Sequence, residues 1–434
     1  FRLRPRAAPG HPGRRGQRLR DGLTLGPMAR SLDNREPAVT AVPDGGFVVP
    51  HPAGPRHPRT PLPPDTVERR KAVAGMARVT LQTIADRVGV SRMTVSNAFS
   101  RPNQLSPTLR ERILAAAQEL GYVGPDPSAR ALAKGTTGAV GFLLTESLGF
   151  AFTDQVSTQL LGAIAEELKP TGLALTLLSA FDTGDIVQAR DVAMDGVLVY
   201  SCDPGTSAVD WLQRRRLPMV FIDQDPLDDV PSVNVADRNG ARAAAQHLID
   251  LGHRRIGLAL AGVRGPQGMI EDVEEVASPK VSGYASRERL AGWMEAFDAA
   301  GVEPLVARQL DDTIEHARTA GRLLLDRDDP PTAVLCFSDV IAFGIIRTAN
   351  DLGLRVPQDL SVVGFDDHPL AGTFRPTLTT VRQNVPDKGK VAAELLTAAL
   401  GRAASESSVP LASVPHVLLP TELVVRDSTA PPRV

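Results

Sequence analysis

From residue 139 onward, short apolar runs alternate with stretches of helical periodicity. Continuous apolar strands that are separated by helices predict βαβ units and parallel sheets buried on both faces. The pattern continues for roughly 300 residues, which is too long for one small sheet, so we expect two α/β lobes. The apolar runs are Ala139–Leu144, Leu173–Ser179, Gly196–Tyr200, Met219–Asp223, Arg255–Ala261, Thr332–Phe337 and Leu360–Phe365.

Residues 79–121 have a different pattern, which predicts three short helices. Thr80 can cap the first, Arg92–Ser100 forms the second, and Ser106 followed by a proline opens the third. Two helices joined by a short turn near a glycine form a helix-turn-helix, which places its second helix in the major groove of DNA. The alternative is a generic three-helix bundle whose polar face is only solvated.

The second helix would turn its apolar residues toward the other two helices and its polar residues outward. Arg92 can then form a bidentate contact with guanine, Asn97 can do so with adenine, and Met93 can touch a thymine methyl. We expect these three residues to read bases. Hydroxyl groups suited to phosphate contacts surround them, at Thr80, Ser91, Thr94, Ser96 and Ser100.

The formal net charge of −2 is an average over parts of opposite charge. Residues 1–77 carry +8, residues 78–136 carry +4, and the remainder of the chain carries −14. A basic front on an acidic body indicates that the two ends meet different partners.

Residues 1–77 contain 13 Pro and 9 Gly, which predicts a disordered extension. We expect that residues 1–75 lie upstream of a true start at Met76. The other interpretation is a basic arm that adds non-specific affinity for DNA.

Several classes of protein are disfavoured by what the sequence lacks. It has no apolar run long enough for a membrane span, no apolar core of a secretory signal, and only two cysteines. It also has no Gly-x-Gly-x-x-Gly after a first strand, no phosphate-binding loop with Gly-Lys-Ser/Thr, and no His-Glu-x-x-His or Cys-x-x-Cys pair. We therefore expect a cytoplasmic protein without catalytic residues, cofactor, metal or membrane partner.

The run Val79-Thr-Leu-Gln-Thr-Ile-Ala-Asp-Arg-Val-Gly-Val-Ser-Arg-Met-Thr-Val-Ser-Asn97 resembles the N-terminus of the lac repressor family of bacterial transcription regulators. The similarity continues over residues 78–428. In that family, the base-reading positions correspond to Arg92, Met93 and Asn97. The resemblance implies a homodimeric repressor that binds a near-palindromic double-stranded operator. A periplasmic-type small-molecule receptor is the alternative, but it would have no use for residues 79–134.

The resemblance also implies a domain order. An all-α helix-turn-helix head and an α/β two-lobed core, similar to periplasmic binding proteins, would be joined by a hinge. The expected parts are the extension 1–77, the head 78–124, the hinge 125–138, the effector-binding and dimerisation core 139–428 and a tail 429–434. Within the core we expect lobe 1 at about 139–236 and 369–402, and lobe 2 at about 237–368 and 403–428.

The hinge segment Asp126–Gly135 has a capping residue, a proline at the first helical position and a terminal glycine. It is too short to be a stable isolated helix, so its residues alone favour a connector turn. The resemblance implies instead a helix that folds when two copies pack together on DNA. Leu132 would then enter the minor groove, flanked by Arg130 and Lys134.

Ligands of open α/β sheets bind at the carboxyl ends of strands, where several polar residues occur. Paired Asp and Arg suit a polyhydroxyl ligand, because a carboxylate accepts hydroxyl protons and a guanidinium donates a fixed fork. In the family, Arg289 and Asp366 match effector-contacting positions. The expected effector site comprises Thr145, Asp223, Arg289, Ser338, Asp366 and Gln383, and its ligand is a sugar, a nucleoside or a related metabolite.

Other polar or aromatic residues near these positions have structural explanations. A carboxylate that closes a strand often only caps the next helix, so we expect structural roles for Asp339 and Asp367, and we expect Trp293 to lie in the core. Two departures from the family pattern disfavour a simple sugar: residues 263–285 form a longer connection, interpreted as a flap or a solvated loop, with the loop favoured. The stretch Gln309–Asp312 lacks the aromatic that some relatives stack on a sugar.

Overall fold

The computed structural model describes residues 79–124, 126–144, 148–180, 187–201, 206–271, 283–404 and 414–433. The predicted N-terminal extension lies outside these residues. None of the helices in the described ranges is long and apolar enough to cross a membrane.

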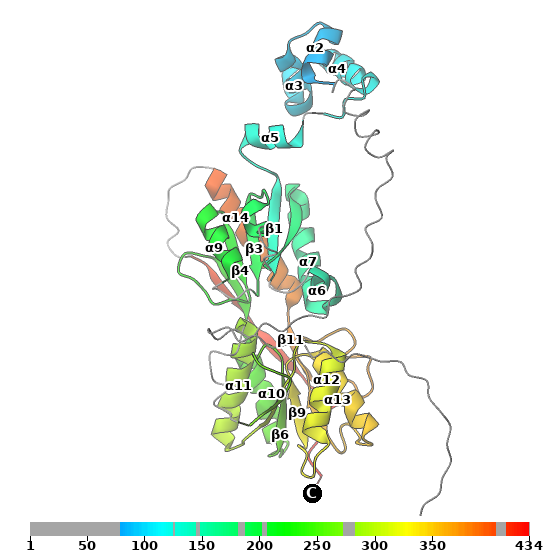
Figure 1. Cartoon of the computed structure of the whole chain (residues 1–434), viewed down its shortest axis with the longest axis vertical. Coiled ribbons are helices and arrows are strands. Elements are labelled where there is room, and N and C mark those ends of the chain that lie inside the picture. The colour runs from blue at the N-terminus through cyan, green and yellow to red at the C-terminus, as the bar shows by residue number, and fades with distance from the viewer. Residues whose placement is uncertain are drawn as a thin grey trace, which may run out of the picture. The chain divides into compact units, whose positions relative to one another are not determined.

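The head consists of the three predicted helices (Figure 1). Thr80 caps the first in a capping box with Thr83, and Gly89, with a φ of 76°, ends it in the left-handed conformation that glycine adopts readily. Apolar side chains from all three helices form a small separate core. The head helices are α2 (Leu81–Val88), α3 (Arg92–Ser100) and α4 (Pro107–Glu119), with a 3₁₀ turn at Pro102–Gln104.

The hinge segment is helical, although its residues alone favoured a turn. Helix α5 spans Pro127–Lys134, the side chain of Asp126 accepts a hydrogen bond from the backbone N–H of Ser128, and Gly135 ends the helix. Eight residues of isolated helix are marginal in water. The segment therefore has the form of a helix without the length to be stable alone.

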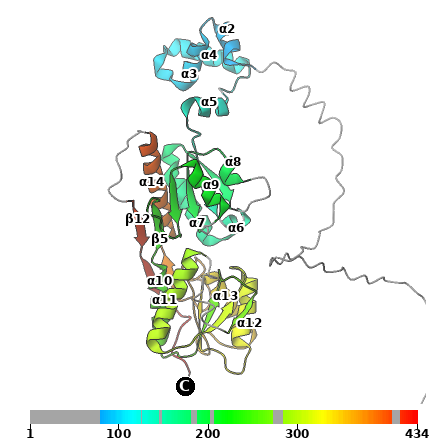
Figure 2. The same cartoon turned by 60° about the vertical axis from the view of Figure 1, so that its left-hand side comes forward.

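The first lobe is built on a six-stranded parallel sheet with the strand order β12-β5-β4-β3-β1-β2. Helices α7 and α14 cover one face of this sheet, and α8 and α9 cover the other (Figures 1 and 2). Its elements are β1 (Ala139–Leu144), α6 (Leu148–Thr153), α7 (Gln155–Leu168), a 3₁₀ turn (Lys169–Thr171), β2 (Ala174–Ser179), α8 (Gln188–Asp191), β3 (Gly196–Tyr200), α9 (Ser207–Arg215), β4 (Met219–Ile222), β5 (Ser232–Val235), α14 (Val385–Ala404) and β12 (His416–Leu419).

The second lobe has a five-stranded sheet with the order β10-β9-β6-β8-β7, and a two-stranded sheet of β11 and β13 that packs against α10. Apolar residues of α10 and α11 fill one face of the larger sheet, and those of α12 and α13 fill the other. Its elements are α10 (Asp237–Asp250), β6 (Ile256–Leu260), β7 (Gly268–Ile270), α11 (Tyr284–Ala300), β8 (Leu305–Arg308), α12 (Ile314–Leu325), β9 (Ala333–Cys336), α13 (Asp339–Asp351), β10 (Ser361–Val363), β11 (Thr380–Gln383) and β13 (Thr421–Val424).

All seven predicted strands are present, but the prediction of purely parallel sheets is wrong at one edge. Strand β7 pairs antiparallel with β8, so part of the long 263–285 connection extends the sheet and is neither a free loop nor a flap. A three-residue strand has too little periodicity to be recognised in a sequence. Residues 272–282 of this connection lie outside the described ranges.

The predicted division between the lobes also needs correction. Residues 369–383 belong to lobe 2, where Ala371 and Leu378 are buried in the core beside α13. Strand β12 belongs to lobe 1, because it pairs with β5, whereas the prediction placed residues 403–428 in lobe 2. The chain thus crosses between lobes after β5, after β11 and after β12, and these short connections have no composition that distinguishes them.

Candidate functional sites

The outer face of α3 carries the three residues predicted to read bases. Val95 and Ala98 are buried against the other head helices, so the opposite face of α3 is turned outward. Arg92 is exposed, the Met93 side chain is 69% exposed, and Asn97 is partly exposed. An exposed methionine contributes nothing to the core of the head, so its side chain is available for contact with a partner.

Four of the five predicted phosphate-contacting hydroxyls, those of Thr80, Ser91, Thr94 and Ser100, already have partners within the head. Ser91 accepts a hydrogen bond from the backbone N–H of Thr94 (3.0 Å), and the two hydroxyls also pair. Thr80 caps α2, and Ser100 donates to the carbonyl of Ser96. Each hydroxyl still has unused lone pairs or an unused proton, so these caps and a phosphate contact are compatible.

Leu132 stands out on α5, because its side chain is 88% exposed. Arg130 and Lys134, on the same helix, are exposed as well. An apolar side chain flanked by two cations fits a surface that is both anionic and able to receive an apolar wedge.

Between the two lobes lies a cavity of about 620 Å³, and both lobes line it. Lobe 1 contributes Asp154, Ser157, Tyr200, Ser201 and Asp223, and lobe 2 contributes Arg289, Asp312, Phe337 and Asp366, with Gln383 at the crossover between them. Four of the six predicted effector residues therefore meet in one cavity. Ser338 is not among the lining residues, and Thr145 lies outside the described residues.

Arg289 lines the cavity, is only 4% exposed and is bonded to several neighbours. Its guanidinium donates to Asp237 at 2.8 Å, to the carbonyl of Phe337 at 2.6 Å and to Asp366 at 3.1 Å. It also lies over the rings of Phe365 and Phe337, with its Cζ 3.6 and 4.6 Å from their centroids. Buried charges of this kind need full pairing, and here the protein itself supplies it.

Asp237, which the sequence analysis did not select, is the second partner in this network. Burial raises its pKa to about 6, and the Coulombic attraction of Arg289 opposes that rise. The residue lies at the first position of α10, directly after the crossover from lobe 1, so it anchors Arg289 at the base of the cleft. Asp237 follows strand β5 closely, and a polar residue after a strand is the pattern that could have identified it as a site residue.

A second buried network joins Asp223, Lys388 and Gln383. The ammonium of Lys388, which is completely buried, donates to Asp223 and to Gln383 (3.0 Å), and Gln383 donates to Asp366 (2.6 Å). The other carboxylate oxygen of Asp223, Oδ1, is buried and accepts no hydrogen bond from any described residue. Lys388 carries no sequence signal, because a lysine in a long helix is ordinarily solvated.

Ser338 and Asp339 have structural contacts. Ser338 caps α13 through the N–H of Ile341 and donates to Asp312 at 2.5 Å, so it reaches the site through another residue. Asp339 accepts from Thr380 and from the N–H of His368, and Asp367 accepts from Arg382 and Arg426. These contacts agree with structural roles for the two aspartates, but the expectation that Asp339 caps the next helix is wrong, because Ser338 caps α13. Trp293 is buried in the core, as predicted.

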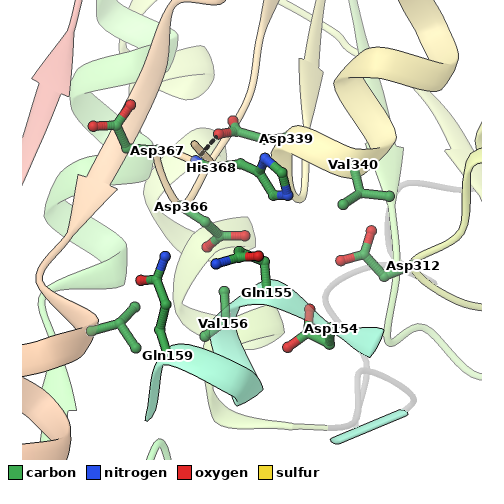
Figure 3. Close-up of a pocket in the computed structure, with 11 residues that line it drawn as sticks. Asp154, Gln155, Val156, Gln159, Asp312, Asp339, Val340, Asp366, Asp367 and His368 are labelled. Atoms are coloured by element: carbon green, nitrogen blue, oxygen red, sulfur yellow. Dashed lines mark hydrogen bonds between the residues drawn. The ribbon is translucent and has the colours of Figure 1, made fainter. Parts of the chain in front are cut away.

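A smaller pocket of about 20 Å³ adjoins the cleft and is bordered by Asp154, Asp312 and Asp366. Figure 3 shows the three carboxylates gathered around it. Burial, together with the charges of Asp366 and Asp154 and against the hydrogen bond from Ser338, raises the pKa of Asp312 to about 7. Burial also raises the pKa of Asp154, with an additional contribution from Asp366. Asp312 carries little sequence signal, because it ends the stretch Gln309–Asp312 and the strand before it, β8, has only four residues.

Comparison with known proteins gives consistent matches for both parts of the chain. Residues 80–125 match the model of bacterial regulatory proteins of the lacI family, and residues 245–429 match a periplasmic binding protein-like domain. A helix-turn-helix transcriptional regulator from Mycolicibacterium smegmatis is 36% identical over 394 residues, which cover 86% of this chain and 100% of the relative.

Two solved structures of regulators are also similar to the chain. The transcriptional regulator CelR in complex with cellobiose has a TM-score of 0.56 at 29% identity, and the match covers 81% of this chain and 100% of that one. The lac repressor dimer bound to operator and the anti-inducer ONPF has a TM-score of 0.62 at 26% identity, covering 82% of this chain and 100% of that one. Both similarities extend over the head and the two lobes.

Proposed function

Because the chain belongs to the lacI family of bacterial regulatory proteins, it is a helix-turn-helix transcriptional regulator, and we propose that it is a homodimeric repressor controlled by a small molecule bound between its lobes. The observation that carries this proposal is the pairing, in one chain, of an outward-facing α3 with a polar cavity lined by both lobes. The first is a surface for DNA, and the second is a site for an effector.

On the DNA side, Arg92, Met93 and Asn97 read bases from the major groove. Leu132 enters the minor groove when α5 packs against its copy from a second chain. Two heads related by a two-fold axis bind a near-palindromic operator, since operator symmetry follows protein symmetry. Support comes from the exposure of Met93 and Leu132, and from the related lac repressor, whose structure is a dimer bound to operator.

On the effector side, the site takes a polyhydroxylated molecule. Asp223 offers a buried oxygen that needs a donor, and Asp366 accepts from Arg289 and Gln383 while bordering the cavity. The related regulator CelR has been solved with cellobiose. A ligand that contacts both lobes favours one lobe arrangement over another, and its effect on DNA affinity is reciprocal with the effect of DNA on ligand affinity.

The protein acts by binding and not by catalysis, in the cytoplasm where its operator lies. The relatives that match along the chain are named as regulators. No group of three or more His, Cys, Asp or Glu side chains within the described ranges has the arrangement of a metal site.

The test is selection of binding sites from a random DNA library by the purified full chain. We expect enrichment of a motif with two-fold symmetry, bound with an affinity that falls steeply with salt because several phosphates are neutralised. Thermal-shift screening of sugars and nucleosides then identifies a ligand, which must change the affinity for the selected site. A library without an enriched motif, or a bound ligand without effect on DNA affinity, contradicts the proposal.

A further inference from the structure

The cavity between the lobes has more carboxylates than cations. Five aspartates border it, at Asp154, Asp223, Asp311, Asp312 and Asp366, and the cations among its lining residues are Arg264 and Arg289. Arg289 already donates to two aspartates and a backbone carbonyl, so its guanidinium is committed to the protein. A phosphate or carboxylate on the ligand would therefore meet excess negative charge.

Three of these carboxylates converge from both lobes on the small pocket of Figure 3. Asp154 precedes α7 in lobe 1, where it accepts from the N–H of Ser157, and Asp312 and Asp366 follow strands of lobe 2. His368 also borders the pocket, and burial lowers its pKa, so it adds no positive charge at neutral pH. Two further aspartates border the pocket, but both oxygens of each already accept hydrogen bonds. Asp339 accepts from Thr380 and from the N–H of His368, and Asp367 accepts from Arg382 and Arg426.

The pocket volume, about 20 Å³, is that of one water-sized group. A protonated primary amine has this size and carries three N–H donors, which matches three surrounding carboxylates. Charge-assisted hydrogen bonds of this kind are stronger than neutral ones, and they relieve the repulsion among the aspartates. No neutral hydroxyl group can supply three donors.

An independent observation on the main cavity indicates what else the ligand contains. Asp223 borders the cavity and is 6% exposed, and its buried Oδ1 accepts no hydrogen bond from a described residue. A buried acceptor without a donor is costly, so a bound molecule that donates to it gains affinity. A hydroxyl group elsewhere on the same ligand fits this oxygen.

We propose that the effector is an amino sugar, whose ammonium lies between Asp154, Asp312 and Asp366 and one of whose hydroxyls donates to Asp223. This assignment rests on the proposed function and specifies the ligand of its site. The ammonium connects lobe 1, through Asp154, to lobe 2, through Asp312 and Asp366. Its contacts therefore depend on the lobe arrangement, which is the requirement for a ligand that shifts a conformational equilibrium.

The test is calorimetric titration of the full chain at pH 7 with D-glucosamine, D-galactosamine and D-mannosamine. Each is compared with its parent hexose, which keeps the size of the substituent but removes its charge, and with its N-acetyl derivative, which is uncharged and too large for the small pocket. We expect at least one free hexosamine to bind about tenfold or more tightly than both neutral counterparts, as charge-assisted hydrogen bonds predict. Asp312→Asn and Asp154→Asn should each remove most of that preference, whereas Glu315→Gln, an exposed carboxylate on α12, should keep it.

The two variants lie on different lobes, so if one fails to fold the other still decides. The inference is overturned if no hexosamine binds, if a neutral counterpart or a hexose 6-phosphate binds as tightly, or if both variants keep the preference. A protein that ignores amines while a neutral sugar changes its operator affinity overturns this inference alone. A protein that selects no DNA sequence overturns the proposed function.

Discussion

The outward faces of α3 and α5 and the cleft between the lobes differ in how far they expose the side chains that we propose to be functional. On α3 and α5, Met93 and Leu132 are largely exposed and contribute to no core. In the cleft, Arg289 and Lys388 are buried and bonded to several neighbours. Substitutions in the head should therefore change binding without changing folding, whereas substitutions in the cleft should change both, and the predictions below test this contrast.

The largest effect is expected for Arg289→Ala. The change leaves Asp237 and Asp366 without their shared cation in a buried site, and breaking a buried pair costs about 3–5 kcal/mol. Urea unfolding followed by circular dichroism measures the free energy of unfolding. Arg318→Ala is the control, because that arginine and its partner Asp351 are both about half-exposed and pair at the surface. A loss of less than about 1 kcal/mol for Arg289→Ala, the range of a surface pair, would mean that the network is not a stabilising unit.

In the head, Asn97→Ala should weaken binding to the selected operator by about 1–3 kcal/mol, because a bidentate contact with a base is lost. The free energy of unfolding should stay within about 0.5 kcal/mol, as expected for a surface position. Asn103→Ala, an exposed asparagine beyond the end of α3, is the matched control. Fluorescence anisotropy gives the affinity. Equal losses for both variants would remove Asn97 from the base-reading set.

Leu132→Ala should weaken operator binding by about tenfold, or 1.4 kcal/mol, because a wedge that bends the DNA is shortened. The side chain is 88% exposed in the single chain, so unfolding should be unaffected. Leu370→Ala, which removes a half-exposed leucine from the second lobe, should leave DNA binding unchanged. An operator affinity that Leu132→Ala does not alter would contradict the minor-groove role.

The contrast between head and cleft also explains what could be predicted from sequence. The head helices, their caps and their outward residues follow from local pattern: Ser91 caps α3, and its buried positions repeat at helical spacing. Each functional side chain there depends on its own helix alone. The prediction of Arg92, Met93 and Asn97 as outward residues therefore agrees with their placement.

The cleft depends on elements far apart in the chain, and prediction was correspondingly partial. Four residues were expected in the cleft, either because they are polar and follow a strand or because they match effector-contacting positions of the family. They are Asp223, Arg289, Asp366 and Gln383, and all four line the cavity. Lys388, Asp237 and Asp312 were missed, since a buried lysine looks like a solvated one and short strands such as β8 have weak periodicity. The same weakness misplaced β12 and the lobe boundary, because the pairing of β12 with β5 joins residues about 180 positions apart.

The smallest effect concerns Asp312 and is a pH dependence. Its pKa in the folded protein is about 7, above its ordinary value of 3.8, so the folded state holds the proton more tightly than the unfolded chain does. Stability from this group is thus fully present below pH 4 and is lost as the pH rises through 7. The free energy of unfolding of Asp312→Asn should then equal that of the parent protein at pH 4 and exceed it at pH 8 by about 1 kcal/mol. The gain is modest because the side chain is only partly buried.

Urea denaturation at the two pH values measures these free energies of unfolding. Asp359→Asn is a control of opposite sign, since Arg355 lowers the pKa of that carboxyl to about 2. If Asp312→Asn is less stable than the parent at pH 8, the ionised carboxylate of Asp312 stabilises the fold. Repulsion among the aspartates, which distinguishes the cleft from the head, would then not determine how Asp312 contributes to stability.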